Sequence, residues 1–137
     1  TVLTNTTTLT ALSTASIPAN TLVAGNAIHI FSQGICISHN ADNTIIITLK
    51  IGNTTIAATT AIALDPNDIY TIDAWIQIRT IGSSGTFVAS GKIVENFYKA
   101  STTIDTTQSQ DITVNGTWNV AHSSNQVRSD MMIVTIH

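Results

Sequence analysis

The segment from Ile69 to Val94 constrains the fold of this chain more than any other part of the sequence. It holds two runs of alternating apolar and polar residues, joined by a Gly-Ser-Ser-Gly bridge at 82–85. One side of the first run is apolar at every second residue from Ile72 to Ile78, and the second run repeats the pattern between Phe87 and Ile93. Alternation with period two is typical of strands, and a short Gly/Ser bridge is typical of a hairpin. The segment therefore predicts a β-hairpin with one face in a core.

The rest of the chain predicts further strands and no helix, because apolar runs recur between turn residues. Within one of these runs the apolar positions change parity at Gly34, which predicts a β-bulge there. Residues 95–103 are interpreted as a connection. With the hairpin, the runs predict an all-β fold, a jelly-roll-like antiparallel β-sandwich of about eight strands. The additional predicted strands are 27–37, 44–51, 54–64, 111–120 and 126–136.

A chain of 137 residues is expected to form one domain with its own core. We assign residues 17–137 to the sandwich. Residues 1–16 are Thr-rich, and they are interpreted as an N-terminal arm, a first edge strand or a linker. The single cysteine, Cys36, lies between two isoleucines and is expected to be buried and unreactive.

Charged residues make up only 9% of the chain, whereas about 25% is typical of soluble domains. Thr, Asn and Ser take their place, and such a neutral polar surface favours packing against further copies of the chain. A β-domain with no special packing is the plainer alternative. The five basic residues are scattered, which argues against a nucleic-acid partner. No apolar run approaches the roughly 18 residues of a membrane span, so no membrane insertion is expected.

The sequence also argues against an enzyme. It contains one glutamate, and the spacing of Gly82-Ser83-Ser84-Gly85 differs from that of a Gly-x-Ser-x-Gly nucleophile elbow. No phosphate-binding glycine loop or zinc-ligand spacing occurs, so we expect no cofactor and no metal.

Three polar loops are the candidate ligand-binding segments. His39 and His122 lie in two of them and could meet in space, although an isolated loop histidine is usually just solvated. The third, Asp65 to Asp68, has oxygens suited to a ligand, but turn chemistry alone also explains it. The candidate residues are His39, Asn40, Asp42, Asp65, Asn67, Asp68, His122 and Asn125.

Two sets of strand residues are candidate subunit contacts. Ile46 and Thr48 lie in an isoleucine-rich run that is predicted to bury both faces, or one face in the core and one in an interface. Trp75, Gln77 and Arg79 occupy the outward positions of the hairpin.

Several motifs occur in an order that resembles the jelly-roll domains of tailed-bacteriophage virion structural proteins. In that family an IPANTL segment, a TLKIG strand and an RTIG-SG hairpin recur. The matching segments are IPANTLVAGNAIHI at 17–30, ITLKIGNTTIA at 47–57, AWIQIRTIGSSGTFVASGKI at 74–93, IDTT at 104–107 and DITVNGTW at 111–118.

The resemblance implies a β-sandwich that is commonly trimeric and that decorates a head or forms a head or tail fibre. Its partners would be further copies of itself and other virion proteins, and its location the virion. The family supplies no catalytic residue. Two alternatives remain: a receptor- or carbohydrate-binding module at a fibre tip that contacts a host-surface glycan, and a cellular adhesion or cytokine-like jelly roll.

Overall fold

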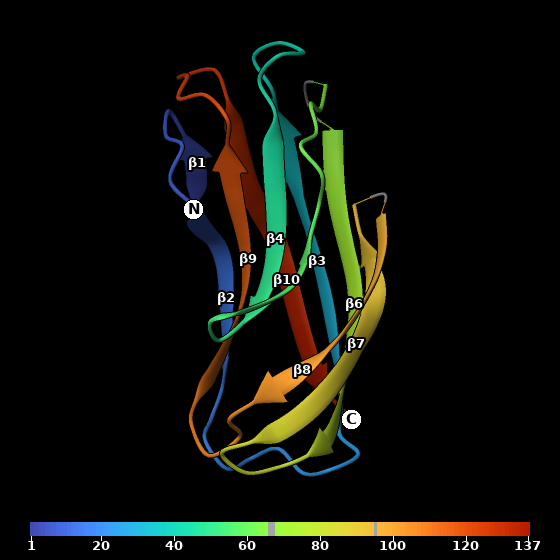
Figure 1. Cartoon of the computed structure of the whole chain (residues 1–137). Helices are drawn as coiled ribbons and strands as arrows, with labels where there is room; N and C mark the ends of the chain where they lie inside the picture. The colour runs from blue at the N-terminus through green and yellow to red at the C-terminus, as the bar shows by residue number, and fades with distance from the viewer. Residues whose placement is uncertain (66–67, 95) are drawn as a thin grey trace.

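The computed structural model describes residues 1–65, 68–94 and 96–137, with the side chains of 96–99 left out of the description. In these residues the chain forms ten strands, arranged as two antiparallel sheets packed into a sandwich (Figure 1). The all-β sandwich expected from the alternation of apolar residues is therefore confirmed. In the part of the chain described, no helix is long and apolar enough to cross a membrane.

One sheet has six strands in the order β1-β10-β3-β6-β7-β8, and the other has four in the order β2-β9-β4-β5. The strand bounds are β1 Val2–Thr4, β2 Thr10–Ile17, β3 Ala27–Ile37, β4 Ile45–Ile51, β5 Thr54–Ala58, β6 Asp68–Thr80, β7 Gly85–Ile93, β8 Asn96–Ile104, β9 Gln110–Trp118 and β10 Gln126–Ile136.

The strand order is that of a jelly roll with one insertion. β1 pairs with β10, β2 with β9, β3 with β6 and β4 with β5. In sequence, each of these pairs therefore lies between the two strands of the pair before it. This nested pairing of eight strands in two sheets is the jelly-roll arrangement. β7 and β8 follow β6 as a meander and enlarge the sheet that contains β6 from four strands to six.

The core lies between the two sheets, and the predicted hairpin supplies much of it. β6 and β7 pair in antiparallel register, and the side chains from Ile72 to Ile78 on the predicted inner side are fully buried. Phe87 and Ile93 of β7 are buried beside them. The four-stranded sheet contributes Ile45, Ile47, Leu49 and Trp118 from the other side.

The Thr-rich segment is part of the sandwich and not a linker. β1 is an edge strand of the six-stranded sheet, and Leu3 places its side chain in the core with 4% exposure. β2 is an edge strand of the four-stranded sheet, with Leu12 and Ile17 buried. The apolar residues of this segment are thus spaced to anchor two short strands in different sheets.

The predicted β-bulge at Gly34 is wrong. β3 alternates without interruption, because Ser32, Gly34 and Cys36 all face the core. The irregularity is in the partner strand β10, between Ser129 and Met131. The change of parity in β3 therefore means that Ile35 and Ile37 point outward from the sandwich.

Two further strand predictions change. Residues 95–103 were expected to be a connection, but Asn96 to Ile104 pair with β7 as an additional strand. The predicted strand 54–64 ends at Ala58, after which Ile62 forms an isolated bridge with Ile45. Cys36 is fully buried, as expected.

Candidate functional site

The outer face of the six-stranded sheet is rich in apolar side chains. Strands of a sandwich normally present polar residues to solvent on this face. Here the large apolar residues that are exposed on it include Ile69 at 60%, Val2 at 53% and Ile133 at 50%. We call this surface the apolar face. Its other apolar members are Phe31, Ile35, Ile37, Trp75, Val88 and Met131.

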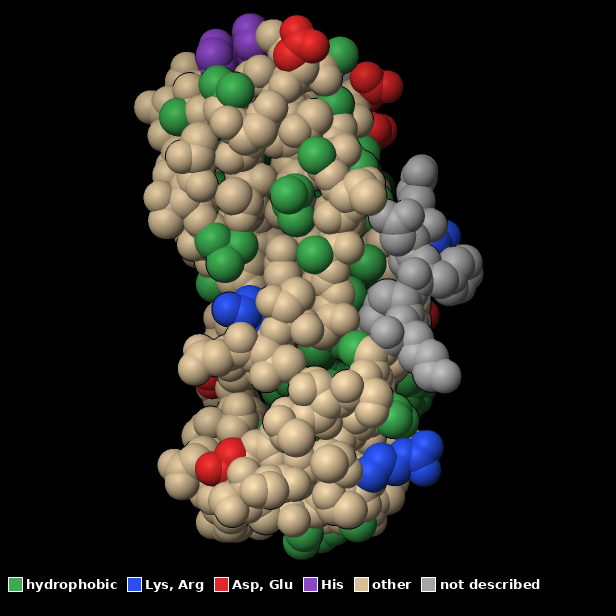
Figure 2. All heavy atoms as spheres, viewed as in Figure 1, with side chains coloured by type: hydrophobic (Ala, Val, Ile, Leu, Met, Phe, Trp, Pro, Cys, Tyr) green, Lys and Arg blue, Asp and Glu red, His purple; other side chains and the backbone are tan. Residues whose placement is uncertain are grey.

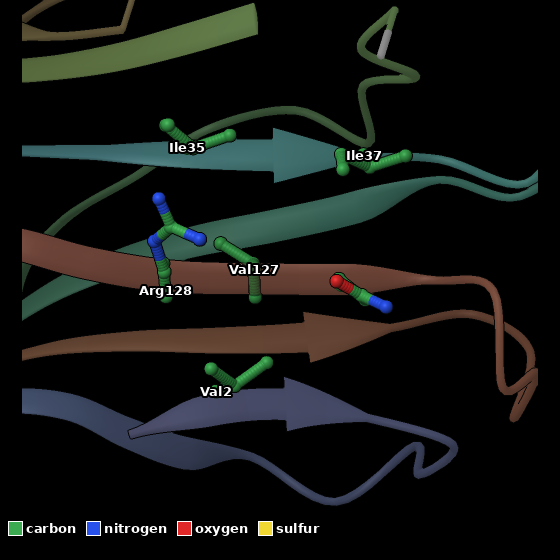
Figure 3. Close-up of a pocket in the computed structure, with 6 residues that line it drawn as sticks. Val2, Ile35, Ile37, Val127 and Arg128 are labelled. Carbon is green, nitrogen blue, oxygen red and sulfur yellow. The ribbon is translucent and has the colours of Figure 1, made fainter. Parts of the chain in front are cut away.

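One half of the apolar face is aliphatic. Val2, Arg128, Ile35 and Ile69 stand opposite one another across β1, β10, β3 and β6. Figure 3 shows Val2, Ile35 and Ile37 around the side chains of β10. The hollow between them measures only about 10 Å³, which is room for at most one water molecule. This surface therefore suits a flat protein contact and not a small ligand.

The other half is aromatic. The imidazole of His29 stacks on the indole of Trp75, with ring centroids 4.3 Å apart and planes 13° apart. The ring of His137 tilts toward the same indole at 5.6 Å. His29 Nε2 lies 2.7 Å from a carboxylate oxygen of Asp73, which holds the imidazole in place. Ile133 pairs with Phe31 in the adjoining row of the sheet.

Two acidic side chains of the apolar face each lie close to a basic side chain. Arg128 Nε donates to Asp130 at 2.7 Å, and Asp73 is paired with His29. Such exposed pairs contribute little to the stability of a single chain. Arg79 and Lys92 add positive charge to the same face.

The outer face of the four-stranded sheet has a different character. Figure 2 views the molecule from this side, and its surface shows few charged and only scattered apolar side chains. Ile46 is 38% exposed on β4, and its neighbours on the same face are mostly threonines. This face is polar and neutral.

The five predicted subunit contacts therefore do not form one surface. Trp75, Gln77 and Arg79 lie on the apolar face, whereas Ile46 and Thr48 lie on the opposite side of the sandwich. Thr48 is only 8% exposed and offers little area to a partner.

The predicted ligand loops gather at one end of the sandwich, which we call the loop end and which comprises residues 38–44, 59–65 and 119–125 (Figure 1). His39 and His122 meet there, with ring centroids 3.8 Å apart and planes 15° apart. The backbone N–H of Ser124 donates to Nδ1 of His122 at 3.0 Å. Histidine side chains lie at this end in Figure 2.

Two asparagines hold the loops of this end together. Asn125 is fully buried, and its Oδ1 accepts from the backbone N–H of His39 at 2.8 Å and from Nδ2 of Asn43 at 3.2 Å. Asn119 accepts from the backbone N–H of Thr44 and donates to the carbonyl of Asp42, both at 2.8 Å. Asn125 is thus a structural residue and not an exposed ligand contact.

A hollow of about 320 Å³ opens beside these loops. Its walls are held by a reciprocal contact, in which Ser38 N–H donates to the Leu64 carbonyl at 3.1 Å and Leu64 N–H donates to the Ser38 hydroxyl at 3.2 Å. Of the predicted ligand residues, three line the hollow. The lining consists of Ser38, His39, Asn40, Ala41, Ala63, Leu64 and Asp65.

The remaining predicted ligand residues do not line this hollow. His122 stacks behind His39, Asp42 lies in the same loop, and the carboxylate of Asp68 accepts from the backbone N–H of Asp65 at 2.9 Å. Asn67 lies outside the described residues. Sequence reasoning missed Ser38, Ala63 and Leu64, since nothing in the sequence brings residue 38 next to residue 64.

No group of three or more His, Cys, Asp or Glu side chains in residues 1–65, 68–94 and 100–137 is placed to hold a metal ion. Comparisons with protein families, with curated proteins and with solved structures returned no match to this chain.

Proposed function

We propose that this protein is a non-enzymatic structural subunit that assembles with copies of itself through the apolar face. The observation that carries the proposal is the set of half-exposed aliphatic side chains on that face, Val2, Ile69 and Ile133. Exposed apolar patches on a protein surface often mark sites of protein–protein contact. A partner that covers it removes apolar surface from solvent.

The energetic gain from covering these residues is substantial. Full burial of a large aliphatic side chain contributes roughly 1.5–3 kcal/mol, so covering a half-exposed one contributes on the order of 1 kcal/mol. Trp75, with 42% exposure, supplies the type of residue that dominates the energetics of many interfaces.

We further propose that the assembly is a bacteriophage virion component, a trimeric head decoration or a head or tail appendage subunit that also contacts other virion proteins. The jelly-roll strand order supports this together with the sequence motifs of the hairpin. The experiment is to label intact particles with an antibody against the chain and to view them by electron microscopy. Label on heads or tails supports the role, and purified particles that contain no such chain contradict it.

A second candidate function, recognition of a receptor or host-surface glycan, is favoured by the loop end. Three loops converge there, and the hollow beside His39 has walls fixed by hydrogen bonds. A structural subunit that presents its loop end outward would be able to carry both functions.

A further inference from the structure

We propose that the hollow at the loop end binds an uncharged monosaccharide unit. This inference rests on the second candidate function and names its ligand class and its position. The hollow measures about 320 Å³, near the lower limit of roughly 300 Å³ for small-molecule sites. It therefore has room for a single small ring and not for an extended chain.

The lining determines the chemical class. Ser38, Asn40 and Asp65 supply hydroxyl, carboxamide and carboxylate groups, and Ala41, Ala63 and Leu64 supply a small apolar surface. A sugar ring presents hydroxyls, which the polar groups of the lining can bind, and C–H groups, which can pack on its apolar side chains. Lysine and arginine are absent from the lining, so the site lacks the groups that recognise a phosphate, a sulfate or a sugar carboxylate.

A divalent cation fits the hollow less well. Calcium takes six to eight oxygen ligands, several of them commonly carboxylates. Asp65 is the one carboxylate of this lining, and no cluster of three metal-ligating side chains occurs in the described residues.

The hollow is preorganised, which lowers the entropic cost of binding. The loop 38–44 is attached on one side to Asn125 and Asn119, and on the other side to Leu64. The imidazole of His39 is held against His122. Asn125 and His122 therefore act as positioning residues, and His39, Asn40 and Asp65 are the groups that contact the ligand.

The test is an NMR titration of the full ¹⁵N-labelled chain with methyl glycosides of neutral hexoses and N-acetylhexosamines. For at least one of them we expect saturable shifts of the amides of residues 38–41 and 63–65, with a dissociation constant in the millimolar range typical of a single small ring. Asp65→Asn should weaken this binding about tenfold, because a charge-assisted hydrogen bond to a sugar hydroxyl is lost.

Asp42→Asn is the matched control. It removes a carboxylate from the neighbouring loop 38–44 that does not line the hollow, and it should leave the dissociation constant unchanged. Within the described residues the Asp65 carboxylate accepts no hydrogen bond, so the amide spectrum of Asp65→Asn should otherwise match the wild type. Absence of shifts at these amides with every glycoside, equal binding by Asp65→Asn, or saturable binding of calcium or inorganic phosphate there would overturn the inference. None of these outcomes bears on the oligomeric state, which tests the apolar face separately.

Discussion

The indole of Trp75 lies parallel to the imidazole of His29, 4.3 Å away, on a sheet face that the single chain leaves exposed to water. The two residues are directly opposite one another on β6 and β3. Asp73 fixes the imidazole through Nε2, so the stack is held in one orientation. A rigid aromatic pair of this kind, next to Ile133 and Phe31, is a preformed contact for another protein surface.

Trp75 should report directly on association. Trp118 is 1% exposed and stays buried in any assembly, so Trp118→Phe leaves Trp75 as the one indole of the chain. We expect its emission to shift to shorter wavelength, and its quenching by acrylamide to fall, as protein concentration rises. Emission that is independent of concentration in a protein shown to associate would place the contact elsewhere.

Gly34→Ala should destabilise the fold strongly. A Cβ at this position would lie 2.0 Å from the carbonyl oxygen of Arg128 and 2.6 Å from the ring of Tyr70, and neither neighbour can move easily. We expect a loss of about 3 kcal/mol in the free energy of unfolding, measured by urea denaturation.

Gly116→Ala is the comparison for that measurement. Its Cβ would meet only side-chain atoms, all at 3.3 Å, and these can shift slightly. The loss should stay within about 1 kcal/mol. Equal losses for both variants would show that the close backbone approach at Gly34 is not the cause.

The example of Gly34 shows what a single sequence can and cannot predict about this fold. Alternation of apolar residues was sufficient for the hairpin, because a strand with one buried face shows its period directly. The change of apolar pattern at Gly34 predicted a bulge in β3. Its actual cause is that Ile35 and Ile37 lie on the outer face of the sheet. β8 was missed because its sequence lacks clear alternation and its strand character depends on pairing with β7.

The stability of the fold should fall at alkaline pH because of Cys36. Burial, with a smaller contribution from Asp68, raises the pKa of its thiol from 9.0 to about 12. Below pH 9 the thiol is protonated in both states and this contribution is fully present. Above pH 9 the unfolded chain ionises first, so the free energy of unfolding decreases up to about pH 12.

Between pH 8 and pH 10.5 we expect Cys36 to account for a loss of about 2 kcal/mol, which Cys36→Ala should remove from the pH profile. Burial also raises the pKa of Tyr70, so part of the alkaline loss should remain in that variant. A pH profile identical to that of the wild type would contradict the assignment to Cys36.

Asn125→Ala should loosen the loop end. The variant leaves the backbone N–H of His39 and the amide of Asn43 without their acceptor, at a site that is fully buried. We expect a loss of about 2 kcal/mol and faster hydrogen exchange at residue 39. Asn119→Ala removes a similar pair of bonds at an exposed position, where water replaces them, and it should cost less than half as much. Equal effects would argue that burial of Asn125 is not decisive.

The candidate sites were only partly predictable. The sequence indicated which loops are polar. Contact between His39 and His122 was one option, but nothing in the sequence showed that these two rings stack on each other. The sequence likewise could not show that Ile46 and Trp75 lie on different faces, because both are candidate outward residues of apolar strands. Their placement on opposite faces follows from which sheet each strand joins, and that depends on long-range pairing.

The central claim is that the apolar face joins copies of this chain, and sedimentation velocity tests it most directly. We predict that the wild type sediments as a homo-oligomer, with a trimer as the expected species. Ile133→Lys places a charge on the apolar face and should weaken association at least about tenfold, since burying an unpaired charge is costly. Ile46→Lys makes the same change at a 38% exposed isoleucine on the opposite face and should leave the oligomer intact. A wild type that remains monomeric at high concentration would contradict the claim, as would an oligomer that Ile46→Lys disrupts and Ile133→Lys does not.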